Sequence, residues 1–372
     1  MRIGLLVLSV GDFGKKGFYN LQEVGLGKEL GKAGHHVDIY KCVRKNTPDT
    51  TEIIAPDVVL HLIGVNTVGN NSFFSCENRL DGSLDVLVCF SDIQYWTTRV
   101  YRWAVRHGIV FIPYAGVTQS QSPSLLKKTL INLLARRVFD VYKKTGVLVK
   151  TNAVRNELRE RGIDKVRTVP VGLDFDLMYN GIYSKSDLLN ELRLDPDMKY
   201  LLMVGRLESD RNPLDVVTVF QGIHRKDGQF RLVVIGAGSL KEDLQSRLAD
   251  HGLADFVIWK DRVPNSEMWK YYRVSDALLS FSRTEIFGMS ILEAMYYELP
   301  VFVIHAPGPD DLILDGETGY LFDSPSEMAE AVLNSHAGEM GKKEKERVVG
   351  HFSWKIMADT IASIADSQGV SD

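Results

Sequence analysis

The sequence predicts an α/β protein of two doubly wound domains, each with a mostly parallel sheet covered by helices on both faces. Three observations predict this fold class: short runs rich in Val, Ile and Leu recur, segments of helical length separate them, and the pattern restarts after residue 197. The chain has 372 residues, enough for about two domains of ordinary size. Two successive strand–helix alternations therefore indicate two α/β domains in series.

Thirteen apolar runs are each long enough for one buried strand. Those of the first half are Ile3–Leu8, Val37–Tyr40, Asp57–Ile63, Asp85–Phe90, Ile109–Tyr114, Val147–Lys150 and Lys165–Val171. Those of the second half are Tyr200–Gly205, Phe230–Gly236, Phe256–Lys260, Ala277–Ser282, Pro300–Ile304 and Gly319–Phe322. Ligands bind beyond the carboxyl ends of parallel strands, so we expect the functional residues in the strand-to-helix loops.

A polar stretch at residues 172–199, rich in Gly and Asp, separates the two halves and is typical of a linker. We therefore place an N-terminal domain at residues 1–174 and a C-terminal domain at residues 175–350. Residues 351–372 are expected to form a closing helix that returns toward the N-terminal domain.

The composition excludes several classes of protein. Hydrophobic residues make up 45% of the chain and charged residues 25%, which is the balance of a soluble globular protein. Cys42, Cys76 and Cys89 have no C-x-x-C spacing, which argues against a disulfide framework and a zinc site. No run reaches the roughly 18 apolar residues that span a bilayer, and the start lacks a signal-peptide cleavage site. We expect a cytoplasmic protein.

The charge is divided unevenly along the chain. Residues 1–174 carry 24 basic and 16 acidic side chains, a net charge of +8, whereas the remainder carries −12. A basic half is compatible with nucleic acid, an anionic membrane or phosphorylated small molecules. The charge division alone does not decide among these partners.

The most informative loop follows the fourth apolar run of the second half. Gly288, Met289 and Ser290 begin a helix there, and the free N–H groups of a helix start suit a phosphate. Glu285 and Glu293 flank this turn. Carboxylates repel phosphate, so their expected role is to accept hydrogen bonds from hydroxyl groups of the same ligand. A phosphate flanked by two hydroxyl-bearing groups describes a nucleotide sugar.

These residues resemble a known signature. Glu285, Phe287, Gly288 and Glu293 match the Glu-x-Phe-Gly-x4-Glu pattern of retaining GT-B glycosyltransferases, in particular family 4, the glycosyl transferases group 1. The resemblance implies the GT-B fold, with two Rossmann-like domains facing across a cleft. It also implies that Glu285 reads donor-sugar hydroxyls and Glu293 binds the nucleotide ribose, with Phe287 in the same nucleotide-sugar-binding loop.

Two arginines extend the resemblance. Arg206 and Arg211 lie in a stretch similar to the family's Gly-Arg-Leu-x3-Lys, whose two cations clamp the diphosphate. Arg211 stands where the family usually has Lys. Either cation can neutralise charge on a departing diphosphate, so Arg206, Arg211 and Glu285 are the expected catalytic residues. The alternative is that the arginines only pair with Glu208 and Asp210 on the surface.

Other segments match the family more briefly. The turns at residues 236–240 and 315–322 resemble its Gly-x-Gly-Pro-Leu and Asp-Gly-x-Thr-Gly-x-Leu turns. The likeness places the nucleobase near Lys260–Val263, which adds Arg262 and Val263 to the predicted nucleotide-sugar-binding residues. The glycine-rich loop after the first run, which contains Gly14, is expected near the donor phosphate.

No cofactor or metal is expected. Asp174-Phe175-Asp176 has the form of the Asp-x-Asp metal motif of a different glycosyltransferase fold, but it falls in the linker. The sequence departs from the family where many members carry a His after the run that ends at Tyr114. Tyr114 or Thr118 could supply a hydroxyl at that place, which leaves the acceptor side open.

The segment from Leu125 to Lys144 mixes leucines with lysines and arginines, without a clean apolar stripe. One interpretation is a surface that lies on the inner face of an anionic cell membrane and reaches a lipid-linked acceptor. The other is a solvated helix whose long side chains cover the core. Nucleic acid is disfavoured as a partner, because neither a binding motif nor an aromatic platform accompanies the basic residues.

We expect a retaining, metal-independent glycosyltransferase that moves a sugar from a nucleotide-diphosphate sugar to a hydroxyl of a glycan or lipid-linked acceptor. UDP is favoured over GDP as the nucleotide, and synthesis of cell-surface polysaccharide or glycolipid is the expected context. Two alternatives stay open. One is a sugar-nucleotide isomerase that resembles 2-epimerases, and the other is a non-catalytic nucleotide-sugar-binding partner of another transferase.

Overall fold

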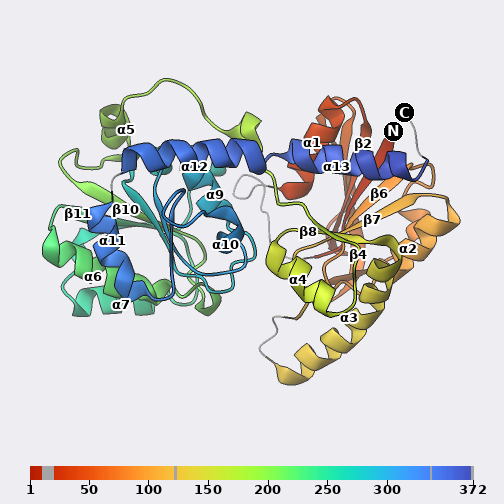
Figure 1. The fold of residues 1–372 in the computed structure, drawn as a ribbon, viewed down its shortest axis with the longest axis horizontal. Coiled ribbons are helices and arrows are strands. Elements are labelled where there is room, and N and C mark those ends of the chain that lie inside the picture. The colour runs from red at the N-terminus through yellow and green to blue at the C-terminus, as the bar shows by residue number, and fades with distance from the viewer. Residues whose placement is uncertain (11–20, 121–123, 336, 370–372) are drawn as a thin grey trace. The chain divides into compact units, whose positions relative to one another are not determined.

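The computed structural model describes residues 1–10, 21–120, 124–335 and 337–369 (Figure 1). The chain divides into two compact units. Unit 1 holds most of the chain up to Gly172 together with the C-terminal segment from Ser353, and unit 2 holds Leu173–Phe352.

Unit 1 is built on a sheet that, in the described residues, has nine strands in the order β3-β4-β2-β1-β6-β7-β8-β9, with β5 paired to β4. The strands are β1 Arg2–Val7, β2 His36–Arg44, β3 Thr50–Ala55, β4 Val58–Val68, β5 Asn71–Phe73, β6 Val86–Phe90, β7 Val110–Ala115, β8 Val147–Val149 and β9 Val166–Thr168. β3 and β5 pair with β4 in antiparallel fashion, and the other pairs are parallel. The parallel strands therefore follow a Rossmann order, which reverses between β1 and β6.

Helices cover both faces of this sheet (Figure 1). They are α1 Gln22–Lys32, α2 Thr97–Arg106, α3 Leu125–Thr145, α4 Asn152–Glu160 and α13 Trp354–Ser367, with the short 3-10 helix η1 Cys76–Asn78. The closing helix α13 packs against α1, where Gly25 leaves room for the indole of Trp354. A Cβ at Gly25 would lie 2.3 Å from the indole nitrogen, so this contact requires glycine.

Unit 2 has the same Rossmann order in its described residues, with six parallel strands arranged β12-β11-β10-β13-β14-β15. The strands are β10 Lys199–Val204, β11 Phe230–Ile235, β12 Val257–Lys260, β13 Ala277–Ser280, β14 Val301–Ile304 and β15 Tyr320–Phe322. The helices are α5 Lys185–Leu192, α6 Val216–Lys226, α7 Lys241–Asp250, α8 Asn265–Val274, α9 Met289–Tyr296, α10 Pro309–Leu312, α11 Met328–Asn334 and α12 Ala337–His351. The 3-10 helices are η2 Phe175–Leu177, η3 Ser209–Arg211, η4 Pro213–Asp215, η5 Ala254–Phe256 and η6 Pro325–Glu327.

Burial on both faces explains why the strands of unit 2 read as continuous apolar runs. Leu201 and Met203 of β10 point into one core, which α6, α7 and α11 cover. The alternate residue Leu202 is also fully buried, on the opposite face. A sheet covered on both faces needs apolar residues at successive positions, which is the pattern from which the two α/β domains were predicted.

Each of the thirteen predicted runs overlaps a strand, and the two strands that the sequence did not reveal are β3 and β5. β3 reads Thr-Thr-Glu-Ile-Ile-Ala and is mostly exposed, so its apolar residues form no run of strand length. β5 has only three residues. Both lie at the antiparallel edge of the sheet, where pairing with β4 replaces burial as the reason for the strand.

The predicted linker contains a helix of its own. α5 lies within residues 172–199 and packs against α8 in unit 2. Asp174 and Asp176 belong to the turn that opens this stretch, where the Asp174 carboxylate accepts a hydrogen bond from the Asp176 N–H at 3.2 Å.

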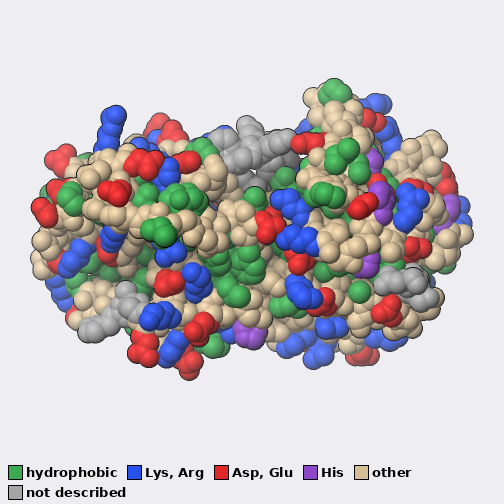
Figure 2. Space-filling model, turned by 90° about the horizontal axis from the view of Figure 1, so that it is seen from above, with side chains coloured by type: hydrophobic (Ala, Val, Ile, Leu, Met, Phe, Trp, Pro, Cys, Tyr) green, Lys and Arg blue, Asp and Glu red, His purple; other side chains and the backbone are tan. Residues whose placement is uncertain are grey.

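On the face of the molecule in Figure 2, acidic and basic side chains lie interspersed.

Candidate nucleotide-sugar site

The predicted site residues gather at the carboxyl ends of β10 and β13 in unit 2. These two strands are neighbours in the sheet, and the strand order reverses between them. In a doubly wound sheet the crevice at this point is the usual ligand site, because the loops on either side leave in opposite directions. The loop after β10 carries both arginines, and the loop after β13 carries Glu285.

Glycines let the loop after β10 approach its neighbour closely. The N–H of Leu207 donates to the carbonyl of Ala237 at 3.0 Å, which joins this loop to the turn after β11. A Cβ at Gly236 would lie 1.9 Å from the carbonyl oxygen of Gly205, and one at Gly238 would lie 2.3 Å from that of Leu207. The glycines of this turn therefore serve backbone packing that fixes the arginine loop.

The two arginines share one carboxylate. Arg206 Nη2 lies 2.7 Å from Asp210 Oδ2, and Arg211 Nε lies 3.6 Å from the same oxygen. Arg211 Nη1 also forms an ion pair with Glu285. The structure thus brings Arg211 and Glu285 together, as two residues of one predicted site would be. The pairing of Arg206 with Asp210 also agrees with the surface-pair interpretation.

Hydrogen bonds join the two loops. The hydroxyls of Ser282 and Thr284 donate to the carbonyl of Asp210 at 3.2 and 3.0 Å. The N–H of Gly308, in the loop after β14, donates to the carbonyl of Glu285 at 2.9 Å. A Cβ at Gly308 would lie 2.4 Å from the backbone of Phe287, so this contact too requires glycine. The backbone around Glu285 is therefore held from two sides.

The loop after β13 turns into α9 at Gly288, which has a left-handed φ of 96°. The first backbone hydrogen bonds of this helix are donated by Ile291 and Leu292, both to Gly288. The N–H groups of Met289 and Ser290 precede these bonds, so neither has an acceptor within the helix. The helix start therefore offers N–H groups to an anion, as the sequence predicts.

Phe287 enters this site only through its backbone. Its side chain is buried and packs edge-on against Phe352, with ring centroids 6.1 Å apart. The sequence places Phe287 among the nucleotide-sugar-binding residues, but an apolar ring in the core cannot hydrogen-bond a ligand. Its ring instead anchors the loop that carries Glu285.

Glu293 lies in α9 and is buried, with 8% of its surface exposed. The hydroxyl of Tyr272, in α8, donates to Glu293 Oε2 at 2.7 Å. Burial raises the pKa of this carboxyl from 4.5 to about 7, and the Tyr272 hydrogen bond lowers it only in part. Sequence reasoning missed Tyr272, since nothing in its spacing marks it as a partner of Glu293.

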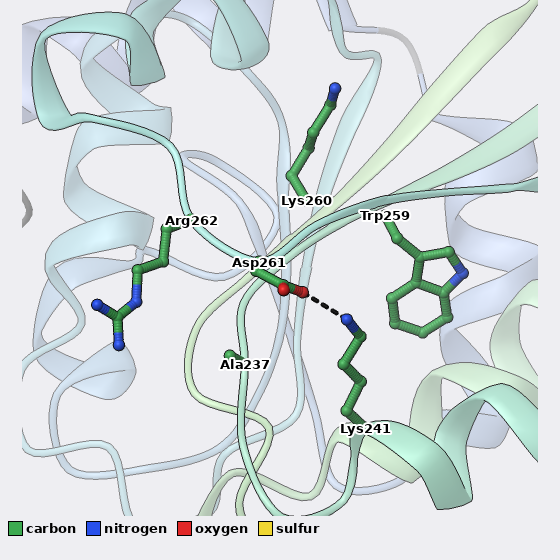
Figure 3. Close-up of a pocket in the computed structure, with 6 residues that line it drawn as sticks. All are labelled: Ala237, Lys241, Trp259, Lys260, Asp261 and Arg262. Carbon is green, nitrogen blue, oxygen red and sulfur yellow. Dashed lines mark hydrogen bonds and ion pairs between the residues drawn. The ribbon is translucent and has the colours of Figure 1, made fainter.

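A pocket lies at the carboxyl ends of β11 and β12, where the nucleobase is predicted (Figure 3). Its lining residues are Ala237, Lys241, Trp259, Lys260, Asp261 and Arg262. Lys241 Nζ and Asp261 Oδ1 lie 2.5 Å apart and point toward each other, while Arg262 lies on the other side of the Asp261 backbone. Val263 follows the pocket and is half-buried. Sequence reasoning missed Lys241 and Trp259, which lie on neighbouring elements.

Three further positions singled out in the sequence lie in the N-terminal half of the chain. Gly14 lies outside the described residues. The hydroxyl of Tyr114 is fully buried in unit 1 and donates to the carbonyl of Val169 at 3.1 Å. The hydroxyl of Thr118 is buried and donates to Glu157. The proton of each hydroxyl is therefore donated within unit 1.

The comparison with known protein families identifies the part of the chain that carries this site. The sequence model of the family Glycosyl transferases group 1 matches residues 184–346. Residues 184–346 are a glycosyl transferases group 1 domain. This domain includes all of the predicted site except Gly14.

Curated relatives of the chain have names that indicate different activities. The chain is 26% identical over 216 residues to an alpha-monoglucosyldiacylglycerol synthase of Streptococcus pneumoniae, covering 57% of this chain and 48% of the relative. It is 29% identical over 207 residues to a D-inositol 3-phosphate glycosyltransferase of Paenarthrobacter aurescens, covering 53% and 50%. The chain thus spans about half the length of the curated relatives it matches.

Solved structures resemble this chain over its whole length. A sucrose-phosphate synthase of Thermosynechococcus elongatus has a TM-score of 0.76 at 19% identity, with 99% of each chain covered. HepE of Anabaena, in complex with UDP and glucose, has a TM-score of 0.71 at 14% identity, covering 99% of this chain and 100% of HepE. WaaG, a glycosyltransferase of lipopolysaccharide biosynthesis, has a TM-score of 0.70 at 15% identity, covering 96% and 99%. The predicted GT-B fold is confirmed.

Proposed function

We propose that the chain transfers a sugar from a nucleotide-diphosphate sugar to an acceptor hydroxyl, with retention of the anomeric configuration. The observation that carries the proposal is the contact between Arg211 and Glu285, at the point where the strand order of unit 2 reverses. A cation for the diphosphate and a carboxylate for sugar hydroxyls are the two groups that such a donor needs side by side.

The ion pairs of the arginines can be exchanged for a diphosphate at little cost. The side chains of Arg206 and Arg211 are 39% and 29% exposed. Ion pairs open to solvent contribute about 0–1 kcal/mol each. Hydrogen bonds from guanidinium to a charged oxygen contribute about 1.5–3 kcal/mol, so a bound diphosphate competes well with Asp210.

In the proposed reaction, the bond between the anomeric carbon and the diphosphate oxygen breaks while the acceptor oxygen bonds to that carbon on the same face. The acceptor proton passes to the departing diphosphate, so no enzymatic nucleophile is needed. Arg206, Arg211 and the N–H groups at the start of α9 stabilise the negative charge on the leaving group. These groups carry the whole charge in this proposal, which therefore uses no metal ion.

UDP is the proposed nucleotide. HepE and a pneumococcal O-GlcNAc transferase of similar fold have been solved with UDP, the latter at a TM-score of 0.56. In this chain the pocket beside β12 is the proposed base site. A matched pair of ligands tests the choice: we expect UDP to raise the melting temperature more than GDP does.

The test of the activity is transfer from UDP-glucose and a panel of other nucleotide sugars, with membrane extract as acceptor source and Arg206→Ala as the impaired variant. We expect UDP release that depends on the acceptor, and a product whose anomeric proton coupling matches that of the donor. Inversion of the coupling would refute retention. Conversion of the donor into an isomeric sugar nucleotide, with no net release of nucleotide, would favour an isomerase. Donor binding without release, transfer or isomerisation would favour a non-catalytic partner.

We also propose that unit 1 lies against an anionic membrane through the first half of α3. Leu125 and Leu126 are 79% and 86% exposed, and Leu133 is exposed as well. Exposed cations at positions 128, 136 and 137 accompany these leucines. The second half of α3 packs into the core through Val138 and Tyr142, so the first half alone is free to insert at an interface. No described helix is long and apolar enough to cross a bilayer.

Vesicle sedimentation tests this surface. We expect the protein to pellet with phosphatidylglycerol vesicles but not with phosphatidylcholine vesicles, and Leu125→Glu/Leu126→Glu to abolish pelleting. Val105→Glu, which replaces another exposed apolar residue of unit 1, is the matched control. Equal sedimentation of the wild type and the double variant would contradict the proposal.

A further inference from the structure

Three neighbouring strands of unit 1 end beside one another and place polar side chains at one edge. β6, β7 and β8 are parallel and adjacent, and the residues that follow them are joined by hydrogen bonds. The N–H of Gly116 donates to Asp92 Oδ1 at 2.7 Å. The N–H of Lys150 donates to the carbonyl of Ala115 at 3.0 Å. Asp92, Gly116 and Lys150 therefore form a cluster at the edge where a doubly wound sheet binds ligands.

Asp92 is held in a strained backbone conformation. Its φ is 39°, in the left-handed region that residues other than glycine adopt rarely. The buried hydroxyl of Tyr142 fixes it by donating to the Asp92 carbonyl at 2.5 Å, and the same hydroxyl lies 2.7 Å from Ser91 Oγ. Strain that surrounding groups enforce is typical of binding sites, because it positions a functional side chain.

Lys150 lies directly above Gly116. A Cβ at Gly116 would lie 2.7 Å from Lys150 Cδ and 3.3 Å from its Nζ, so the lysine side chain occupies the space that glycine leaves. Lys150 Nζ lies 5.6 Å from the centre of the Tyr114 ring. The lysine side chain therefore packs over Gly116, and its ammonium group lies near the Tyr114 ring.

Among the described residues, the ammonium group of Lys150 has no acidic partner. Over the part of the chain that the structure describes, no carboxylate oxygen lies within 4.0 Å of Nζ, and Lys150 is half-buried. Packing alone would be satisfied by an uncharged side chain such as Met. A half-buried cation without a counter-ion is a group that an anionic ligand can neutralise.

We propose that Asp92 and Lys150 form a subsite for an acceptor that carries an anionic group, phosphate or carboxylate, near its reacting hydroxyl. Lys150 binds the anionic group, and the Asp92 carboxylate accepts a hydrogen bond from a hydroxyl of the same molecule. The proposal rests on the proposed function, because it names the class of acceptor for that transfer. It assigns the acceptor side to residues outside the glycosyl transferases group 1 motifs.

Ligand-observed saturation-transfer NMR on the full chain tests the subsite without requiring turnover. The probes are glucose 6-phosphate and glucuronate, which carry the two anionic groups on similar sugars, with glucose as the neutral control. Lys150→Met keeps the length of the side chain over Gly116 but removes its charge, and Lys150→Arg keeps the charge. UDP-induced thermal protection of each variant reports the fold and the donor site independently.

We expect at least one anionic probe to bind at least tenfold more tightly than glucose. Lys150→Met should weaken that probe about tenfold or more and should leave UDP protection unchanged, while Lys150→Arg should retain binding. Comparison of the two anionic probes distinguishes phosphate from carboxylate. Three results would overturn the subsite while leaving the donor site intact. Glucose and both anions could bind equally, neither anion could bind, or Lys150→Met could leave anion binding unchanged. If UDP did not protect the wild type against thermal unfolding, the proposed function would be refuted instead.

Discussion

Substitution of Glu293 by Gln should change both the stability of the protein and its affinity for UDP in a pH-dependent way. Burial raises the pKa of Glu293 from 4.5 to about 7. Between these values the folded chain retains a proton that the unfolded chain has lost. The free energy of unfolding therefore falls with rising pH by about 1.4 kcal/mol per unit. This contribution is fully present below pH 4.5 and is lost as the pH rises through 7.

The variant Glu293→Gln carries no such proton, so its unfolding should lack this slope. From pH 5 to pH 7 the wild type should lose about 2–3 kcal/mol relative to the variant. For a domain of the size of unit 2 that difference corresponds to about 5–10 °C in melting temperature. Differential scanning calorimetry over this pH range measures it. Parallel curves for the two proteins would refute the burial argument.

The same carboxylate should couple UDP binding to pH. A ribose hydroxyl donates more strongly to an ionised carboxylate, so UDP affinity should rise with pH up to about 7 and then level off. Isothermal titration in buffers of different ionisation enthalpy should detect proton release near pH 6. Protons can be released by Glu293 and by the phosphate of UDP. Glu293→Gln should abolish the first contribution and leave the second. Unchanged release in the variant would argue against a ribose role for Glu293.

Two other substitutions test the packing of unit 2. Burial raises the pKa of Glu344, in α12, from 4.5 to about 8, and the backbone of Val301 lowers it only in part. Glu344→Gln should therefore stabilise the protein increasingly between pH 5 and pH 8, by about 1.4 kcal/mol per unit in calorimetry, and a pH-independent difference would contradict this. Gly238→Ala places a Cβ against the Leu207 backbone, so it should lower the free energy of unfolding by about 1–3 kcal/mol and weaken UDP binding. The control is Gly228→Ala, which has open space around its Cβ and should change neither quantity.

The fold could be predicted because its strands are buried on both faces. Continuous apolar runs marked every parallel strand, and polar turns marked the connections. β3 and β5 could not be predicted, because β3 is half polar and mostly exposed and β5 has only three residues. Their pairing with β4 depends on a partner that local sequence does not reveal. The α5 helix was likewise hidden in a polar segment.

The site could be predicted in part. Resemblance to the family's motifs indicated Arg211 and Glu285, which contact each other although 74 residues separate them. It could not reveal Asp210 as the carboxylate shared by the two arginines, or Tyr272 as the partner of Glu293, because such contacts depend on tertiary packing. It also could not reveal that the Phe287 ring belongs to the core.

The central claim is that the arginines of unit 2 bind the diphosphate of a nucleotide sugar. The most direct test is the Kd of Arg211→Ala for UDP and for uridine, measured by isothermal titration beside the wild type and the exposed control Arg225→Ala. Two lost charge-assisted hydrogen bonds should raise the Kd for UDP at least tenfold while the Kd for uridine stays the same. An equal change for both ligands, or no change for either, would contradict the account.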